Sequence, residues 1–238
     1  MLSDMNPDDN TQRPLFGFLP RLERAQRRQL LEDFQQSSRW NVDFVIMMAL
    51  ATALAALGLL NDSVAVVIGA MLVAPLMSPL IGAGFALVQG NLVLFRDCFK
   101  AMFYGVVVSL LVSLVLGLVT PAYELTPELE ARANVNLLDL GIALLSGMAA
   151  AYALARPNLV ATLSGVAIAA ALVPPLATVG IAATSDEYYL SLLALVLFLT
   201  NLVAITVGAA IVYRLLGVHG AVAGSGMPSW AQRTIMLL

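Results

Sequence analysis

The chain has 238 residues, of which 60% are hydrophobic and 11% are charged, and its formal net charge is −3. Soluble domains carry about a quarter charged residues, so this composition excludes an ordinary soluble fold and predicts an all-α integral membrane protein in the lipid bilayer. The slightly acidic balance gives no reason to expect a nucleic-acid partner. One cysteine and one histidine exclude an intrachain disulfide and the usual zinc clusters, so we expect no metal and no cofactor.

Residues 1–40 form a polar N-terminal segment that contains a predicted amphipathic helix at 20–36. Its apolar residues fall at helical spacing and can share one face: Leu22, Leu30, Leu31 and Phe34. Two interpretations stay open, a helix that lies on anionic lipid and a cytoplasmic helix that docks on its own bundle. Six basic and six acidic residues before residue 40 balance each other, so charge does not decide between them.

Six apolar stretches follow, each near the roughly 20 residues that a transmembrane helix needs. They predict a six-span membrane domain at 41–215, followed by a C-terminal tail at 216–238. The connection at 120–135 is predicted to be an exposed loop with a helical turn after Pro127. The predicted spans are approximately 41–60, 63–89, 98–119, 136–155, 158–183 and 188–213.

The basic residues predict the orientation of these spans, because cytoplasmic loops are enriched in Lys and Arg. Eleven of the twelve basic residues fall on one side of the six-span model, and Arg132 alone falls on the other. We therefore expect the N- and C-termini to be cytoplasmic.

Prolines interrupt the second and fifth predicted spans, at Pro75 and Pro79 and at Pro174 and Pro175. Proline lacks an N–H and leaves the carbonyl four residues earlier without its helical partner. Such backbone groups cannot face lipid, so they need protein partners or a wet cavity. The two interrupted segments are therefore expected to meet in the interior.

The two interrupted segments also resemble each other. At an offset of 100 residues, the stretch VVIGAMLVAPL at 66–76 matches VAIAAALVPPL at 166–176. This match predicts two repeats of three spans, at about 41–119 and 136–213. An odd number of spans per repeat makes the repeats inverted in topology, as in many secondary transporters. The alternative is that the prolines are ordinary kinks and that the small residues simply permit close helix packing.

Polar residues inside spans are the candidates for a binding site. Ser78 and Thr178 follow the two interruptions, and Asn201 lies near the centre of the sixth span. For Asn201 an interhelical hydrogen bond is an equal alternative, and for Ser78 a bond to a preceding helical carbonyl is the simpler explanation. The complete predicted substrate-binding set is Pro75, Ser78, Pro79, Pro174, Pro175, Thr178 and Asn201.

Asp43 and Asp139 are the carboxylates nearest to the span interiors, each within about one turn of the start of its span. In a transporter, such a pair could serve in gating or proton coupling. The alternative for each is capping of a helix N-terminus or reaching out to the membrane surface.

Three stretches carry a resemblance to a known family: SVAVVIGAMLVAPLMSPLIGAG, GVAIAAALVPPLATVG and FLTNLVAI. They resemble the bacterial and archaeal membrane family catalogued as domain of unknown function 389, over about residues 40–215. The resemblance implies a hydrophobic domain in the cytoplasmic (inner) membrane of a prokaryote. It implies no substrate, cofactor or catalytic residue.

The function predicted from these features is an ion or small-solute transporter or channel, with its site between the interrupted segments two and five. The alternative is a non-transporting membrane scaffold, sensor or assembly protein. We expect no enzymatic activity, because no span contains a histidine or two aspartates at matching depth. The many small residues in the spans also favour a homo-oligomer.

Overall fold

The computed structural model describes residues 22–38, 41–120, 125–132, 136–156, 159 and 172–218. These residues form α-helices and connecting turns, with no β-strand among them, which confirms the predicted all-α class. The helices are α1 (Arg24–Ser37), α2 (Val42–Leu60), α3 (Val64–Val73), α4 (Met77–Gln89), α5 (Leu92–Val119), α6 (Pro127–Ala131), α7 (Leu137–Leu154), α9 (Val173–Ala183) and α10 (Tyr188–Leu215).

Four of these helices, α2, α5, α7 and α10, are long and apolar enough to cross a membrane. The pair α3 and α4 adds a fifth candidate if it is counted as one broken span, bent by 54°. Together these helices indicate a membrane protein. The first part of the predicted span 158–183 lies largely outside the described residues, and α9 is its second part.

Asparagine side chains cap the N-termini of three of the long helices. The side-chain oxygen of Asn41 accepts a hydrogen bond from the N–H of Phe44 at 2.8 Å, and the side-chain oxygen of Asn91 accepts one from the N–H of Leu94 at 3.1 Å. The side chain of Asn136 accepts the N–H of Asp139 at 2.9 Å. These bonds satisfy backbone donors that the helix leaves without a partner, and they fix where α2, α5 and α7 begin.

Pro75 lies in the break that separates α3 from α4, as the sequence predicts. α3 ends at Val73, Ala74 is extended, and α4 begins at Met77 after Leu76. A proline cannot donate the backbone bond that would continue the helix, so the interruption follows directly from the sequence.

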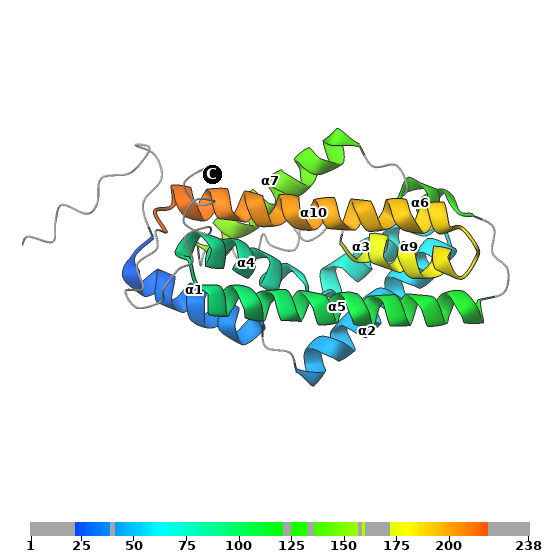
Figure 1. Cartoon of the computed structure of the whole chain (residues 1–238), viewed down its shortest axis with the longest axis horizontal. Helices are drawn as coiled ribbons and strands as arrows, with labels where there is room; N and C mark the ends of the chain where they lie inside the picture. The colour runs from blue at the N-terminus through cyan, green and yellow to red at the C-terminus, as the bar shows by residue number, and fades with distance from the viewer. Residues whose placement is uncertain are drawn as a thin grey trace, which may run out of the picture.

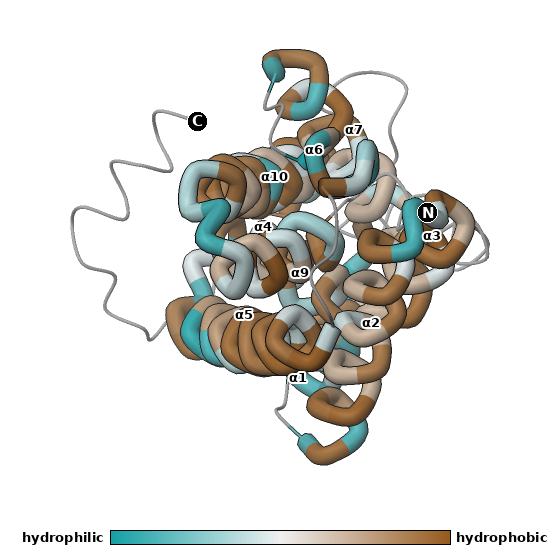
Figure 2. Tube along the Cα trace, turned by 90° about the vertical axis from the view of Figure 1, so that its right-hand side faces the viewer, coloured by the Kyte–Doolittle hydropathy of each residue, from teal (hydrophilic) through white to brown (hydrophobic). Residues whose placement is uncertain are grey.

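The two short helices α4 and α9 form the core of the bundle. Figure 2 shows both near its middle, with α5, α10 and α2 around them. Along the bundle they separate, with α4 in the half nearer α1 and α9 in the half nearer α6 (Figure 1). Every residue of α4 from Pro79 to Ala86 is buried, and so is nearly all of α9. A helix that is apolar all round belongs in such an interior.

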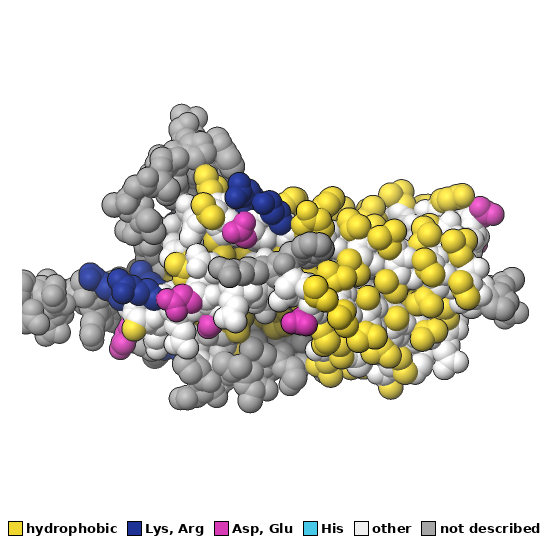
Figure 3. Space-filling view, turned by 90° about the horizontal axis from the view of Figure 1, so that it is seen from below, with side chains coloured by type: hydrophobic (Ala, Val, Ile, Leu, Met, Phe, Trp, Pro, Cys, Tyr) yellow, Lys and Arg dark blue, Asp and Glu magenta, His cyan; other side chains and the backbone are white. Residues whose placement is uncertain are grey.

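The long helices α2, α5, α7 and α10 turn apolar faces outward. Leu54, Leu111, Leu145 and Val203 are among their large exposed side chains. In Figure 3, hydrophobic side chains cover one half of the visible face, while the Lys and Arg side chains lie over the other half. An apolar exterior of this kind fits contact with lipid rather than water.

Two small elements dock on opposite ends of the bundle, which we call the α1 end and the α6 end (Figure 1). In the region of the predicted amphipathic helix, the structure has α1, which buries Leu30 and Phe34 against its own bundle. The predicted helical turn after Pro127 is confirmed as α6. The prediction of a merely exposed loop needs correction, because Leu129 of α6 is completely buried.

Candidate functional site

The break before α4 lies halfway along the neighbouring helix α5. A Cβ atom added to Gly105 would lie 2.7 Å from Cδ2 of Leu76, the N-cap residue of α4. Gly105 stands at the middle of the 28 residues of α5. A helix terminus therefore lies at about half the length of a helix long enough to span the bilayer.

The residues predicted around this break differ in exposure. Pro75 and Ser78 are half-buried, whereas Pro79 is buried within the first turn of α4. Leu76 is apolar and provides no side-chain cap. Since α4 begins without a side-chain partner for its first N–H groups, these groups depend on other partners at this level of the bundle.

In the fifth predicted span, Pro174 and Pro175 occupy the first turn of α9. Proline is well tolerated there, because the first turn has no helical acceptor for its N–H groups. Thr178 is completely buried and donates its hydroxyl to the carbonyl of Pro174 at 3.0 Å. The Thr178 hydroxyl is thus satisfied within its own helix, while Ala170 and Ala171, whose carbonyls the prolines were expected to free, lie outside the described residues.

The two interrupted segments contact each other, because α9 packs against α3. α9 also packs against α2, which belongs to the first predicted span. The contact between α9 and α3 agrees with the expectation that segments two and five meet in the interior. Asn201 lies at the middle of α10, 5% exposed, on a helix that packs against both α4 and α9.

The two candidate aspartates lie in first turns of helices. Asp139 accepts the backbone N–H of Asn136 at 3.2 Å and completes a capping box with the Asn136 side chain. Asp43 lies in the first turn of α2 and is exposed. Both positions suit a negative charge near a helix N-terminus, so the capping alternative is supported for Asp139.

Glycines bring α4 and α9 into close contact with the two long helices. A Cβ atom on Gly84 of α4 would lie 2.8 Å from the Cβ of Ala209 in α10. A Cβ atom on Gly180 of α9 would lie 2.7 Å from the Cβ of Ser113 in α5. Real Cβ atoms essentially never approach so closely, so both positions require glycine for this packing.

The outer helix pairs also cross closely. Thr52 of α2 and Ser109 of α5 are both completely buried, and their hydroxyl oxygens lie 2.9 Å apart in a hydrogen bond. Where α7 crosses α10, a Cβ atom on Gly147 would lie 2.7 Å from the Cα of Ile205. One crossing is thus held by a polar pair and the other by backbone proximity.

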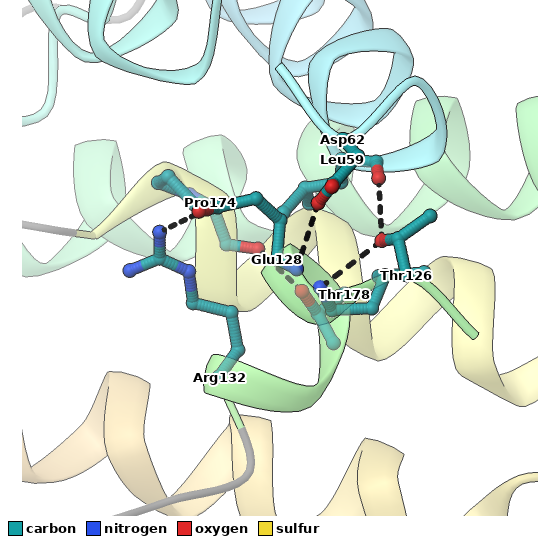
Figure 4. Close-up of polar contacts among 8 residues, drawn as sticks. Leu59, Asp62, Thr126, Glu128, Arg132, Pro174 and Thr178 are labelled. Carbon is teal, nitrogen blue, oxygen red and sulfur yellow. Dashed lines mark hydrogen bonds and ion pairs between the residues drawn. The ribbon is translucent and has the colours of Figure 1, made fainter. Parts of the chain in front are cut away.

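At the α6 end, α6 is tied to the end of α2 (Figure 4). The Thr126 hydroxyl donates to the carbonyl of Leu59 at 2.7 Å, and the N–H of Glu128 donates to the carboxylate of Asp62 at 3.2 Å. Arg132 forms an ion pair of 3.0 Å with Glu128 within the same element. These contacts hold the buried Leu129 in place.

Sequence reasoning missed Thr52, Leu129 and Tyr213, all of which the structure buries. Thr52 could have been found from the sequence, because its hydroxyl is a polar group inside the apolar first span. Tyr213 offered no signal, because a tyrosine near the end of a span is usually an interfacial anchor. Its ring is instead fully buried beside Phe34 and Phe85.

The described site consists of helix termini, glycine contacts and neutral side chains. α3, α4 and α9 contain no charged residue. Such an arrangement can offer hydroxyl groups, an amide and backbone dipoles to a small ligand at mid-depth.

The chain is similar to an uncharacterised protein of the archaeon Methanocaldococcus jannaschii, with 28% identity over 198 residues. This match covers 83% of the chain but 61% of the archaeal protein, so the chain spans about three-fifths of the length of this relative. No solved structure matches the chain. The family model described as "Domain of unknown function (DUF389)" matches residues 71–207, more than half of the sequence. The chain is a member of this family of domains of unknown function, as its sequence motifs predict.

Proposed function

We propose that the protein is an ion or small-solute transporter or channel, with a pathway that passes between the broken segment α3–α4 and α9. The observation that carries the proposal is the presence of two short buried helices in opposite halves of the bundle, one of which begins at mid-length of α5. A helix terminus at this depth leaves backbone groups that lipid cannot satisfy, and transporters use such termini to bind their cargo.

The proposal includes an inverted repeat that relates the two halves of the chain. The contacts of two glycines, one in each half, support this repeat. Gly84 lies eight residues after Leu76, the N-cap of α4, and Gly180 lies eight residues after Leu172, the N-cap of α9. Their contacts, Ala209 and Ser113, each lie 22 residues after the N-cap residue of their own long helix. The contact of α4 with α10 therefore has the same register as the contact of α9 with α5.

The crossing of α2 with α5 and the crossing of α7 with α10 also have equal spacings from the N-cap residues of their helices. Thr52 and Gly147 each lie 11 residues after the asparagine that caps their helix. Ser109 and Ile205, which they contact, each lie 18 residues after the N-cap of α5 or α10. Two independent contacts in each half thus agree on one correspondence between the halves, which is the pattern expected from a duplicated three-span unit.

This correspondence uses an offset of 95 or 96 residues, rather than the 100 derived from matching letters. The two offsets differ by about one helical turn, and apolar low-complexity sequence matches itself well at neighbouring turns. At an offset of 96, Pro175 corresponds to Pro79 rather than to Pro75. Identical pairs in this register include Leu76/Leu172, Pro79/Pro175, Leu80/Leu176, Gly84/Gly180 and Ala86/Ala182.

The same register supports a site role for Asn201. Asn201 corresponds to Gly105, and Gly105 lies against Leu76 at the start of α4. By this correspondence, Asn201 belongs beside Leu172 at the start of α9. Its amide is then a polar group beside the start of α9, whereas the corresponding position beside the start of α4 is Gly105, against which the Leu76 side chain packs.

The proposed cargo is small, because the proposed pathway is lined by short side chains and backbone. Ser78, Thr178 and Asn201 would supply neutral oxygen and nitrogen atoms, with no charged residue in α3, α4 or α9. We place the protein in the cytoplasmic membrane of a prokaryote, with the basic α1 end facing the cytoplasm. In this proposal the protein has no enzymatic activity, and it forms a homo-oligomer.

The test is flux through purified protein in liposomes, with imposed gradients of K⁺, Na⁺, Cl⁻ and H⁺ measured in turn. Thr178→Val and Asn201→Ala should each reduce the flux of the wild-type protein at least about tenfold, because each removes a polar group from a site with few of them. Thr120→Val is the matched control, since Thr120 also donates to a preceding helical carbonyl but lies at the end of α5.

Protein that is folded and inserted but silent for all four gradients would contradict transport of these ions. A scaffold or sensor would then be the better explanation, and the broken helices would serve packing. Equal flux in the wild-type protein and both site variants would instead contradict the location of the pathway.

A further inference from the structure

Helix α1 covers the end of α4 with one aromatic side chain. Phe34 is 2% exposed, and its ring centroid lies 5.5 Å from that of Phe85 in α4 and 6.3 Å from that of Tyr213 in α10. Gly82 of α4 provides the space beneath this ring, since a Cβ atom there would lie 3.1 Å from Cδ1 of Phe34. Phe34 therefore closes the α1 end of the buried helix.

Leu129 has the corresponding position at the α6 end. Phe34 lies seven residues before Asn41, the N-cap of α2, and Leu129 lies seven residues before Asn136, the N-cap of α7. Both side chains are buried, and both belong to a short helix that precedes the first long helix of its half. The register that relates the membrane helices thus extends to these two caps.

The packing under α1 buries the hydroxyl of Tyr213. This hydroxyl has no hydrogen-bond partner among the residues that the structure describes, although the Tyr213 ring packs edge-on against Phe34 and Phe85. A buried hydroxyl without a partner costs free energy that contact with water would recover. The docked position of α1 is therefore opposed by a penalty that undocking would relieve.

The contacts of α1 beyond its apolar face lie at its two ends. Near the first turn, the N–H of Leu22 donates to the carbonyl of Leu216 at 3.1 Å, and Arg27 donates to the carbonyl of Gly217. At the last turn, the Ser38 hydroxyl lies 3.1 Å from the sulfur of Cys98 in a hydrogen bond. An element held mainly at its ends and by a few apolar side chains belongs to the least stable part of a fold.

We propose that α1 is a movable cap that closes the α1 end of the pathway, with Phe34 as its plug and Leu129 as the corresponding plug at the α6 end. The role of the cap as a gate rests on the proposed transport function, but the movement of α1 can be measured without transport. Opening lifts Phe34 from Gly82, hydrates the Tyr213 hydroxyl and uncovers Cys98.

Cys98 reports this opening directly. It is the single cysteine of the chain, and it is completely buried under the last turn of α1. A membrane-impermeant maleimide should label Cys98 slowly in the wild-type protein, at a rate set by the fraction of open molecules. Phe34→Ala should raise this rate at least about tenfold, because it removes the largest buried side chain of the cap.

Phe103→Ala is the matched control for this variant. Phe103 lies on α5, like Cys98, but is 56% exposed. Its truncation should leave the labelling rate of Cys98 unchanged. Equal labelling rates in the wild-type protein and a folded Phe34→Ala variant would overturn the movable cap.

A second variant tests whether the cap controls flux. Ser38→Cys places two sulfur atoms where a hydrogen bond now joins Ser38 and Cys98, so mild oxidation should join α1 to α5 by a disulfide. The oxidised variant should lose flux and regain it on reduction, while the oxidised wild-type protein is unaffected. Equal flux in the oxidised and reduced variant would overturn the cap as a gate.

The two proposals fail in different ways. If Cys98 labelling responds to Phe34→Ala while the wild-type protein carries no flux, the proposed transport is overturned and the movable cap is supported. If the wild-type protein carries flux, but Phe34→Ala does not change the labelling rate of Cys98 and the disulfide does not change the flux, the cap is overturned and transport stands.

Discussion

Thr52 and Ser109 form a hydrogen bond of 2.9 Å between two completely buried hydroxyls, at the crossing of α2 and α5. Thr52 also donates to the carbonyl of Met48 at 2.8 Å, so the two oxygens belong to one short network. A polar pair inside an otherwise apolar crossing fixes the register of the two helices, because sliding by one turn would separate the partners.

Replacement of Thr52 by valine should therefore destabilise the protein by about 1 kcal/mol, the typical value for a hydrogen bond between membrane helices. Unfolding in mixed micelles with increasing SDS measures this change. In a double-mutant cycle, Ser109→Ala should cost much less in the Thr52→Val background than in the wild-type protein. Fully additive effects would show that the two hydroxyls act independently.

Gly180→Ala should destabilise the protein by about 1–3 kcal/mol, because the new Cβ atom would overlap with α5 at Ser113. Gly69→Ala in α3 is the matched control, since nothing lies within 4 Å of a Cβ atom at that position. There the substitution should be neutral or stabilising by up to about 1 kcal/mol, the helix preference of alanine over glycine. SDS unfolding of both variants gives the comparison.

The double variant Gly180→Ala with Ser113→Gly should recover only part of this loss, because it removes the Ser113 side chain but leaves the backbone nitrogen of Leu114 2.8 Å from the new methyl group. By the proposed repeat, Gly84→Ala with Ala209→Gly should likewise recover only part of the loss in the other half, because the carbonyl oxygen of Thr206 stays 2.8 Å from the new methyl group. Rescue in one half without rescue in the other would count against the shared register.

Tyr213→Phe should raise the free energy of unfolding by about 1 kcal/mol, because it removes a buried hydroxyl for which the described part of the chain provides no partner. If α1 is the movable cap, the same change should also slow the labelling of Cys98. Tyr189→Phe, at a side chain that is 75% exposed, is the control and should change neither quantity. A marked loss of stability in Tyr213→Phe would reveal a partner for this hydroxyl.

Two substitutions distinguish whether Asp139 only caps the N-terminus of α7 or also takes part in gating or proton coupling. Asp139→Ala removes an acceptor of the capping box and should cost about 1 kcal/mol, whereas Asp139→Ser retains an oxygen and should cost less. If Asp139 only caps α7, flux through Asp139→Ser should equal that of the wild-type protein at every pH. Loss of flux in this stable variant would return Asp139 to a role in gating or coupling.

The sequence alone predicts the features that follow from local chemistry. Pro75 ends a helix because it lacks a donor, and Asn41 and Asn136 begin helices because their side chains accept first-turn N–H groups. The amphipathic α1 was likewise predicted, although charge balance left its docking surface open. In the structure, Phe34 of α1 packs against Phe85 and Tyr213 of the bundle.

Packing between distant segments could not be predicted in this way. Gly84 and Gly180 are two of many small residues in the spans, and only the opposing helices distinguish them. Leu129 lies in a polar stretch that reads as exposed, and its burial depends on the end of α2, about 70 residues earlier. In the proposed repeat, the register taken from these contacts likewise differs by about one helical turn from the register taken from matching letters.

The burial of α4 and α9 has a consequence for how the protein is assembled. With 13 and 11 residues, each is too short to cross a bilayer alone and depends on its neighbours. α4 packs against α10, which is synthesised about 100 residues later, while α9 packs against α5 from the first half of the chain. Neither half can complete its interior by itself. Membrane insertion should therefore finish only when α10 has been synthesised, and two separately expressed halves should be stable only when they are made together.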